Sequence, residues 1–467
     1  MQVTSPLPPQ PQTLSFGAMI TALFDALDRE GVRPFVLRNY EGFPENNVGS
    51  DVDFLIQHSD LPRALRALQS IHGIQIAGYA ERYYVAHVFV EGVTPAPGVR
   101  ALGIDFIWSM NWKGVPYMPA ETVLAAAQPL SAGHSTFYVP NPVHEAIISL
   151  LATLIIGGRL KEKYLPKVRQ TFTGNRSEAI SGMAPQYGLK AATRLVDSVV
   201  GGDRQKTLDG VWPLRCALVL RGLWRRPLRC IFACAGYHAR ELIVRCTPST
   251  LETICILGAD ERGKTELIRT LLPLLKYSAK LVESRHFGPV GSQKTESTNS
   301  LANGDVRSGF FASQASMARI VLDAAKEWPR LFRKRDNLTL RVCESSSYPQ
   351  AFGFECRGDE SAWRFTQFVW KLLPSPDLWI LLDTTIDRML SGNPSLTRED
   401  AERKLESYRS FARTRKNCIV LDASRPVDTV AEEAYAAIIN ALVRRTQIRL
   451  KKRFPQSLTF DKGKAAH

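Results

Sequence analysis

Residues 253–265 read TICILGADERGKT, and this stretch decides the fold of the second half of the chain. The apolar run TICIL predicts a buried strand, and the apolar residues that follow Lys264 recur at helical spacing. The loop between them fits GxxxxGK followed by Ser or Thr, in which backbone N–H groups at the start of a helix wrap a phosphate. A strand, a glycine-containing loop and a helix in this order predict a nucleotide site.

The chemistry of such a loop gives its last two residues separate roles. Lys264 reaches the β- and γ-phosphate oxygens, and the hydroxyl of Thr265 is a ligand of Mg²⁺. We therefore predict ATP and Mg²⁺ as ligands, with Lys264 as a catalytic residue. The predicted nucleotide-binding residues of the loop are Gly258, Asp260, Arg262, Gly263, Lys264 and Thr265.

Three more apolar runs follow the loop: LTLRVC, LWILLD and CIVLD. Each run is short, and each is followed by a stretch with helical spacing, as in a buried parallel sheet with helices on both faces. The sequence therefore predicts a parallel-sheet α/β domain over residues 248–450.

The segments around these runs resemble the thymidylate-kinase-like branch of the P-loop kinases. The resemblance rests on LPSPD before LWILLD, on TREDAERKLESYRSFA and on CIVLDASRPVDTV. It implies ATP-dependent phosphoryl transfer, with Glu344 as the catalytic acid after the second strand. The chain lacks the family's arginine after that acid, and it has Gly392-Asn393 where the family's lid carries Arg-Lys. The arginines that can replace the missing ones are Arg357, Arg388, Arg398 and Arg403.

A second group of candidate residues lies in the first third of the chain. The segment GSDVDFLI places Asp51 and Asp53 two residues apart on a predicted strand, so their side chains point to the same face. Asp105, in the later apolar segment GIDF, can add a third carboxylate from a neighbouring strand. Carboxylate oxygens are preferred ligands of Mg²⁺, so we predict a metal site at Asp51, Asp53 and Asp105.

These acids resemble the Asp-x-Asp pair and the later aspartate of the nucleotidyltransferase fold in the polymerase beta superfamily. The resemblance implies that Asp51 and Asp53 hold metal and that Asp105 helps to hold it and deprotonates the nucleophile. In that family, a spacer of about a dozen residues separates the Gly-Ser turn from the Asp-x-Asp pair. This chain departs from the pattern, because its Gly49-Ser50 directly precedes Asp51. At the matching place stands Arg38, which either takes over a phosphate contact or leaves triphosphate binding weaker.

The formal net charge of +15 is concentrated in two short stretches. Residues 201–246 hold nine basic and three acidic residues, and residues 444–467 hold eight basic residues and one acid. Because the rest of the chain is nearly neutral, the charge gives little support to a nucleic-acid partner. Residues 211–247 are predicted to form basic helices that either connect the domains or lie on an anionic membrane surface.

The chain is predicted to be an α/β and α+β multidomain protein. Its parts are a disordered tail at 1–13, a nucleotidyltransferase-like α+β domain at 14–141, a basic helical region at 142–247, the P-loop domain at 248–450 and a basic tail at 451–467. The spacing of its 8 cysteines matches no zinc or redox motif, and its longest apolar run is too short to span a bilayer. These features predict a cytoplasmic protein, with peripheral contact to the inner membrane as an option.

The order of these parts resembles proteins of bacterial surface-polysaccharide gene clusters, in which a nucleotidyltransferase-like domain precedes a kinase-like one. RHFGP at 285–289 matches the His-x-x-Pro segment of that variant. The resemblance implies a transferase of envelope polysaccharide metabolism that uses a nucleoside triphosphate and an acceptor of unknown identity. The alternative is a non-catalytic ATP-binding scaffold or sensor with a degenerate kinase domain.

Overall fold

The computed structural model of the chain describes residues 13–45, 51–96, 99–132, 135–246, 253–258, 261–286, 339–344, 376–392 and 396–455. Its contacts group the chain into an N-terminal unit, Gln10–Thr247 with Thr446–His467, and a C-terminal unit, Pro248–Arg445 with Met1–Pro9. Both units combine helices with sheets that contain parallel strands, which agrees with a multidomain α/β protein. The finer division into five segments remains a prediction.

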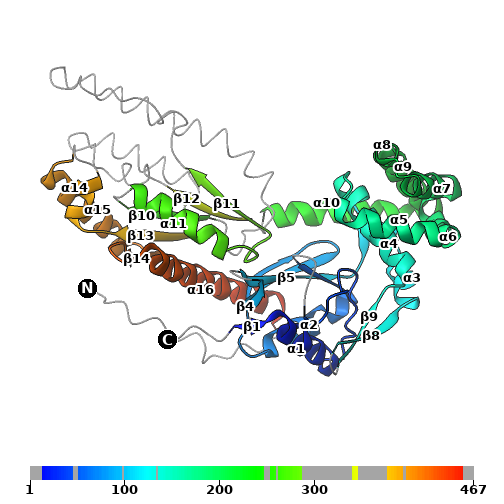
Figure 1. The fold of residues 1–467 in the computed structure, drawn as a ribbon, viewed down its shortest axis with the longest axis horizontal. Helices are drawn as coiled ribbons and strands as arrows, with labels where there is room; N and C mark the ends of the chain where they lie inside the picture. Colours follow the sequence, from blue (N-terminus) through cyan, green and yellow to red (C-terminus); the bar gives the residue numbers. More distant parts are fainter. Residues whose placement is uncertain are drawn as a thin grey trace, which may run out of the picture. The chain divides into compact units, whose positions relative to one another are not determined.

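A five-stranded mixed sheet forms the centre of the N-terminal unit (Figure 1). Strand β4 pairs with β1, β3 and β5, and β2 pairs with β5. The β2–β5 pair is parallel, whereas β3 and β5 run antiparallel to β4. The strands are β1 (Leu14–Ser15), β2 (Asp51–Leu55), β3 (Gln75–Glu81), β4 (Val85–Ala96) and β5 (Val99–Ile107).

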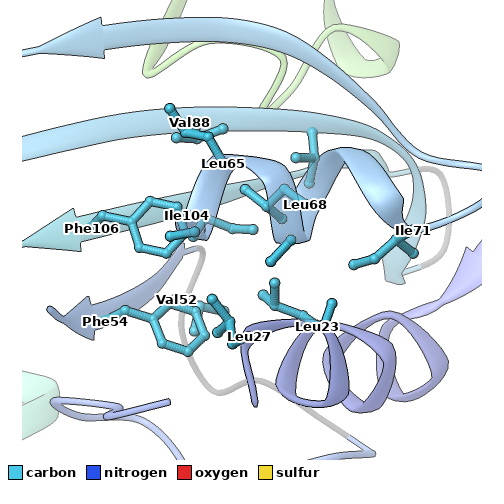
Figure 2. Packing of buried hydrophobic residues seen from close by; sticks show 14 of the residues in the cluster. Leu23, Leu27, Val52, Phe54, Leu65, Leu68, Ile71, Val88, Ile104 and Phe106 are labelled. Atoms are coloured by element: carbon cyan, nitrogen blue, oxygen red, sulfur yellow. The ribbon is translucent and has the colours of Figure 1, made fainter. Parts of the chain in front are cut away.

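Two helices, α1 (Phe16–Arg29) and α2 (Leu61–Ser70), cover one face of this sheet (Figure 2). Alternate residues of a strand point to opposite faces. The even-numbered residues of β2 and β5 lie against the two helices, so Asp51, Asp53 and Asp105 lie on the other face. The packed apolar side chains include Leu23, Leu27, Val52, Phe54, Leu65, Leu68, Ile104 and Phe106.

Short elements and a helical region follow the sheet. A side-chain cap begins the helical region, because Asn141 accepts a hydrogen bond from the backbone N–H of His144 at 2.7 Å. The short elements are β6 (Met110–Trp112), β7 (Val115–Met118), α3 (Ala120–Ala125), β8 (Gln128–Ala132) and β9 (Ser135–Val139). The helices are α4 (Pro142–Leu151), α5 (Leu165–Gly174), α6 (Arg176–Tyr187), α7 (Leu189–Val200), α8 (Arg204–Asp209), α9 (Val211–Arg225) and α10 (Pro227–Cys246).

The core of the helical region reaches the acid-bearing face of the sheet. Its buried cluster includes Leu55, which shares a face of β2 with Asp51 and Asp53, together with Phe35 and Leu37. The three acids therefore lie where the sheet meets the helical region.

Glu81, at the end of β3, connects the sheet to α10 and to the last turns of α16 (Val427–Arg453). Its buried carboxylate accepts hydrogen bonds from Arg453 at 2.8 and 3.0 Å and from Tyr79 at 3.0 Å, and it lies 3.2 Å from the guanidinium of Arg240. Burial raises the pKa of Glu81, but the hydrogen bonds and charges of Arg453 and Arg240 outweigh it, so the pKa is below its ordinary value.

Glu81→Gln is expected to destabilise the chain by about 1–3 kcal/mol at neutral pH, because it leaves two arginines without their carboxylate. A carboxyl group with a lowered pKa stabilises the fold above its unfolded pKa, and this contribution is lost as the pH falls through the folded pKa. Thermal unfolding should therefore show a gap between wild type and variant at pH 7 that narrows only below about pH 4.5, the ordinary pKa of glutamate, and closes as the pH falls through the lowered pKa of Glu81. The exposed pair of Glu162 with Arg204 gives the control, since Glu162→Gln should change little. Equal melting temperatures for wild type and Glu81→Gln at neutral pH would contradict this account.

The C-terminal unit contains a five-stranded parallel sheet of order β11–β12–β10–β13–β14. Four of these strands match the predicted runs; the edge strand β11, with its polar sequence LVESRH, was not predicted. Helix α11 contacts β10, β11 and β12, and α15 contacts β13 and β14. The strands are β10 (Thr253–Gly258), β11 (Leu281–His286), β12 (Thr339–Glu344), β13 (Leu378–Asp383) and β14 (Cys418–Asp422). The helices besides α16 are α11 (Glu261–Leu274), α14 (Ile386–Gly392) and α15 (Arg398–Thr414).

Among the described helices, none combines the length and the apolar character needed to cross a membrane.

Candidate functional site

The register of β2 against β5 brings the three predicted acids of the N-terminal unit together. Asp53 lies directly opposite Asp105 in the parallel pair, and Asp51 lies opposite Gly103. One carboxylate oxygen from each of Asp51, Asp53 and Asp105 falls within 4.8 Å of the others. Three oxygen ligands at this spacing, on the face that meets the helical region, can hold a divalent cation.

The electrostatics of this cluster favour a cation. The side chain of Asp53 is only 2% exposed, and burial raises its pKa to about 6, with Asp51 and Asp105 adding to the effect and Arg38 opposing it. Like charges this close disfavour ionisation of all three groups together. A cation between the carboxylates would remove that penalty, and a proton competes for the same oxygens below about pH 6.

Arg38, predicted as a nucleotide-binding residue, contacts the acid cluster. Its Nε donates a hydrogen bond to Oδ2 of Asp53 at 2.5 Å, and the backbone N–H of Leu37 donates to the Asp53 carbonyl at 2.9 Å. The guanidinium carbon also lies 5.8 Å from the ring centroid of Tyr164. Gly49-Ser50, which precedes the pair in sequence, lies outside the described residues.

His87 is a residue of this site that the sequence analysis missed. It lies opposite Asp105 in the antiparallel β4–β5 pair, and its Nδ1 is 2.7 Å from Oδ1 of Asp105. A histidine that bonds a ligand carboxylate fixes the orientation of that carboxylate. The sequence around it, YYVAHVFV at 83–90, is typical of a strand but does not give the register of that strand against β5.

The helical region contributes a second polar network beside Arg38. The hydroxyl of Tyr40 donates to Glu145 at 2.7 Å, and Lys167 donates to Glu145 at 2.6 Å and to Glu41. Burial lowers the pKa of Lys167, but hydrogen bonds to the two glutamates outweigh it, so the pKa is raised and the ammonium stays charged. This network fixes the segment that carries Arg38 against α4 and α5.

The predicted phosphate loop lies between β10 and α11 in the C-terminal unit. The side chain of Lys264 is 1% exposed, and its Nζ donates to the carbonyl of Gly258 at 2.9 Å. A Cβ atom on Gly258 would lie 3.0 Å from Cβ of Leu382, so a larger residue here would require the neighbouring strand to shift. The backbones of Arg262 and Gly263 belong to α11, whereas Asp260 and the side chain of Arg262 lie outside the described part of the structure.

Thr265 and Glu344, predicted from separate segments, lie together. The Thr265 hydroxyl is 3.2 and 3.4 Å from the two carboxylate oxygens of Glu344, which ends β12 beside β10. A hydroxyl and a carboxylate at the end of a phosphate loop are oxygen ligands suited to Mg²⁺.

The sheet topology places this loop where ligands bind in open α/β sheets. In the sheet, β11 lies on one side of β10, and β14 lies on the opposite side of β13. The connections that follow these two adjacent strands therefore run in opposite directions, which makes the position between β10 and β13 a topological switch point. Ligands bind outside the carboxyl ends of the strands at such a point. Lys264, Thr265 and Glu344 all lie at this end.

The arginines named as replacements for the missing lid and post-strand arginines have other partners or lie outside the described residues. Arg388 donates to the carbonyl of Ala423. Arg398 and Arg403 form exposed ion pairs with acids of α14 and α15, and Arg357 is not described. A further arginine that the sequence did not indicate, Arg409 of α15, lies 3.1 Å from both oxygens of Asp383 at the end of β13.

Comparison with known proteins supports a kinase-like region. No protein-family model matches the chain. The thymidylate kinase of Staphylococcus haemolyticus is 28% identical over 198 residues, which cover 40% of this chain and 96% of that protein. The chain is thus similar, over a part of its length, to a nucleotide-binding kinase.

Proposed function

We propose that the C-terminal unit binds ATP and Mg²⁺ and transfers a phosphoryl group. The observation that carries the proposal is the meeting of Lys264, Thr265 and Glu344 at the carboxyl end of a parallel sheet. The similarity of a part of the chain to a thymidylate kinase supports a kinase-like activity.

In this proposal the residues of the loop hold the triphosphate. The backbone N–H groups around Gly263 and the N-terminus of α11 bind the β-phosphate, and the buried ammonium of Lys264 bridges the β- and γ-phosphates. Thr265 and Glu344 would hold Mg²⁺, which neutralises charge on the transferred group when bound. An acceptor oxygen attacks the γ-phosphorus, the bond from that phosphorus to the bridging oxygen breaks, and ADP leaves.

We also propose a nucleotidyl-transfer site at Asp51, Asp53 and Asp105 of the N-terminal unit. These acids would hold Mg²⁺, which when bound stabilises the negative charge on the leaving pyrophosphate. Asp105, positioned by His87, takes the proton of the acceptor hydroxyl, and Arg38 compensates the charge of Asp53. The acceptor oxygen attacks the α-phosphorus and pyrophosphate leaves. Participation in bacterial envelope polysaccharide metabolism is part of this proposal, and it rests on the resemblance in domain order.

A non-catalytic ATP-binding scaffold is the second candidate. It is favoured by the exposed ion pairs of Arg398 and Arg403, which are held by acids of α14 and α15. One missing arginine at a phosphoryl-transfer site can lower turnover on the order of 10³-fold or more. In this case the loop would bind ATP without chemistry.

The position of the label in ATP distinguishes these activities. We expect full-length protein with Mg²⁺ and a bacterial small-molecule extract to transfer label from γ-labelled ATP if the C-terminal unit acts, and from α-labelled ATP if the N-terminal unit acts. ATP binding by calorimetry without transfer from either label would support the scaffold. A protein that neither binds ATP nor transfers either label would refute both transferase proposals.

A further inference from the structure

Helix α10 exposes an apolar stripe that neither proposed activity uses. Successive residues of a helix are rotated by about 100°, so the stripe falls within about 120° of arc. Amphipathic helices of soluble proteins normally turn such a stripe toward the core. The exposed residues of the stripe are Leu228, Ile231, Phe232, Ala235, Ala239 and Leu242.

The opposite face of α10 is packed within the N-terminal unit. The ring of Tyr237 lies 5.9 Å from that of Tyr83 and 6.5 Å from that of Tyr84, between centroids. Glu241 accepts a hydrogen bond from Arg82 at 2.7 Å, and Val244 is buried. These contacts fix the rotation of the helix, so the apolar stripe remains on the outside.

The exposed surface continues around the junction of α9 and α10. Trp224, in the last turn of α9, is 90% exposed, and Leu220 one turn earlier is 66% exposed. A tryptophan this exposed leaves both its apolar ring and its N–H in water, although such rings favour the boundary between water and an apolar phase.

Three exposed arginines stand at the same junction. The guanidinium groups of Arg225, Arg226 and Arg229 form no hydrogen bond or ion pair with any residue that the structure describes. No acidic residue lies in the sequence between Asp209 and Glu241. The junction therefore presents a local positive charge that no described partner balances.

Other arginines of α9 and α10 have structural partners. Arg215 donates to the carbonyl of Ile155 at 2.7 and 2.9 Å, Arg221 donates to that of Pro185 at 3.4 Å, and Arg240 contacts Glu81. The basic helices thus serve two roles: some arginines fix the helices, and the three at the junction face solvent.

We propose that this surface, the α10 stripe with Trp224 and the three junction arginines, binds an anionic lipid bilayer. The apolar side chains would enter the boundary between headgroups and acyl chains, and the arginines would contact lipid phosphates. A second copy of the chain fits less well, because a symmetric pairing would place three arginines against three arginines. Nucleic acid would engage the arginines but leave the apolar stripe in water. The proposal does not depend on either transferase activity.

Flotation of the full-length protein with lipid vesicles tests the proposal. We expect binding to vesicles of phosphatidylcholine mixed with phosphatidylglycerol, weaker binding at high salt, and little binding to pure phosphatidylcholine. Replacing Arg225, Arg226 and Arg229 with serine should lower the affinity roughly 100-fold. Leu228→Ser should also lower it, whereas Leu189→Ser on α7 should not, although both leucines are 68% exposed.

The outcomes separate the possible occupants of this surface. A blue shift of tryptophan fluorescence on adding anionic vesicles, lost in Trp224→Phe, would support insertion. Failure to float, equal binding to neutral vesicles, or equal effects of the two leucine variants would each overturn the proposal. A dimer in sedimentation velocity that Leu228→Ser dissociates, without vesicle binding, would assign the surface to a second copy instead.

Discussion

Lys264→Ala is expected to abolish high-affinity ATP binding by the C-terminal unit. Removing one partner of a buried charge-assisted interaction costs about 2–5 kcal/mol, which corresponds to at least about a 30-fold rise in Kd. The side chain of Lys264 is buried beside Gly258, so it is already placed where the loop wraps a phosphate. Calorimetric titration of ATP–Mg²⁺ into the full-length protein measures the effect.

Two further variants separate binding from folding. Lys264→Met keeps the side-chain volume in the buried site but removes the ammonium, so it should bind ATP as poorly as the alanine variant while melting like wild type. Lys280→Ala, which removes an exposed lysine of the same unit, should leave binding unchanged. Wild-type ATP affinity in Lys264→Met would show that the loop only resembles a phosphate site.

The phosphate loop was predictable from sequence because its information is local. Strand, loop and helix follow one another within thirteen residues, and each has a strong pattern of its own. The neighbour of Thr265 could be named only through a family resemblance, since Glu344 is 79 residues away and the order of strands decides which carboxylate lies beside the loop. Strand β11 was missed because it lies at the sheet edge, where Glu283 and Ser284 interrupt the apolar run.

The acid cluster likewise combines residues that the sequence predicts with a residue that it does not. Strand alternation predicts that Asp51 and Asp53 share a face, which the register of β2 and β5 bears out. His87 could not be predicted, because its contact with Asp105 depends on the register between two antiparallel strands. Arg38 was singled out by position, and its contact with Asp53 arises because the segment before β2 lies along that strand.

The basic helices could be recognised from charge, but their roles could not. Sequence alone does not separate Arg215, which is held by a backbone carbonyl, from Arg226, which faces solvent. Both sit in the same arginine-rich stretch between apolar residues. The packing of α9 against the other helices of this region decides which of its arginines face solvent.

Asp53→Asn is expected to abolish both divalent-cation binding and nucleotidyl transfer at the N-terminal unit. Loss of a partner that only supports a metal ligand costs about 10–100-fold in metal affinity, and loss of a ligand should cost more. The variant His87→Gln removes the contact to Asp105 but no ligand, so its metal affinity should be lower than that of wild type by about 10–100-fold. Titration with Mn²⁺, followed by its paramagnetic signal in the full-length protein, measures both affinities without requiring turnover.

The variants must also separate metal loss from damage to the fold. Asp53 carries the buried pairing with Arg38, so its replacement can destabilise the strand even though the asparagine oxygen still accepts a hydrogen bond. Asp51→Asn removes a more exposed ligand of the same cluster and should give the same loss of Mn²⁺ binding with a smaller change in melting temperature. Asp197→Asn, at an exposed ion pair with Arg176, is the matched control. If Asp51→Asn and Asp53→Asn bind Mn²⁺ as well as Asp197→Asn does, the three acids do not form a metal site and Arg38 alone accounts for the charge balance of Asp53.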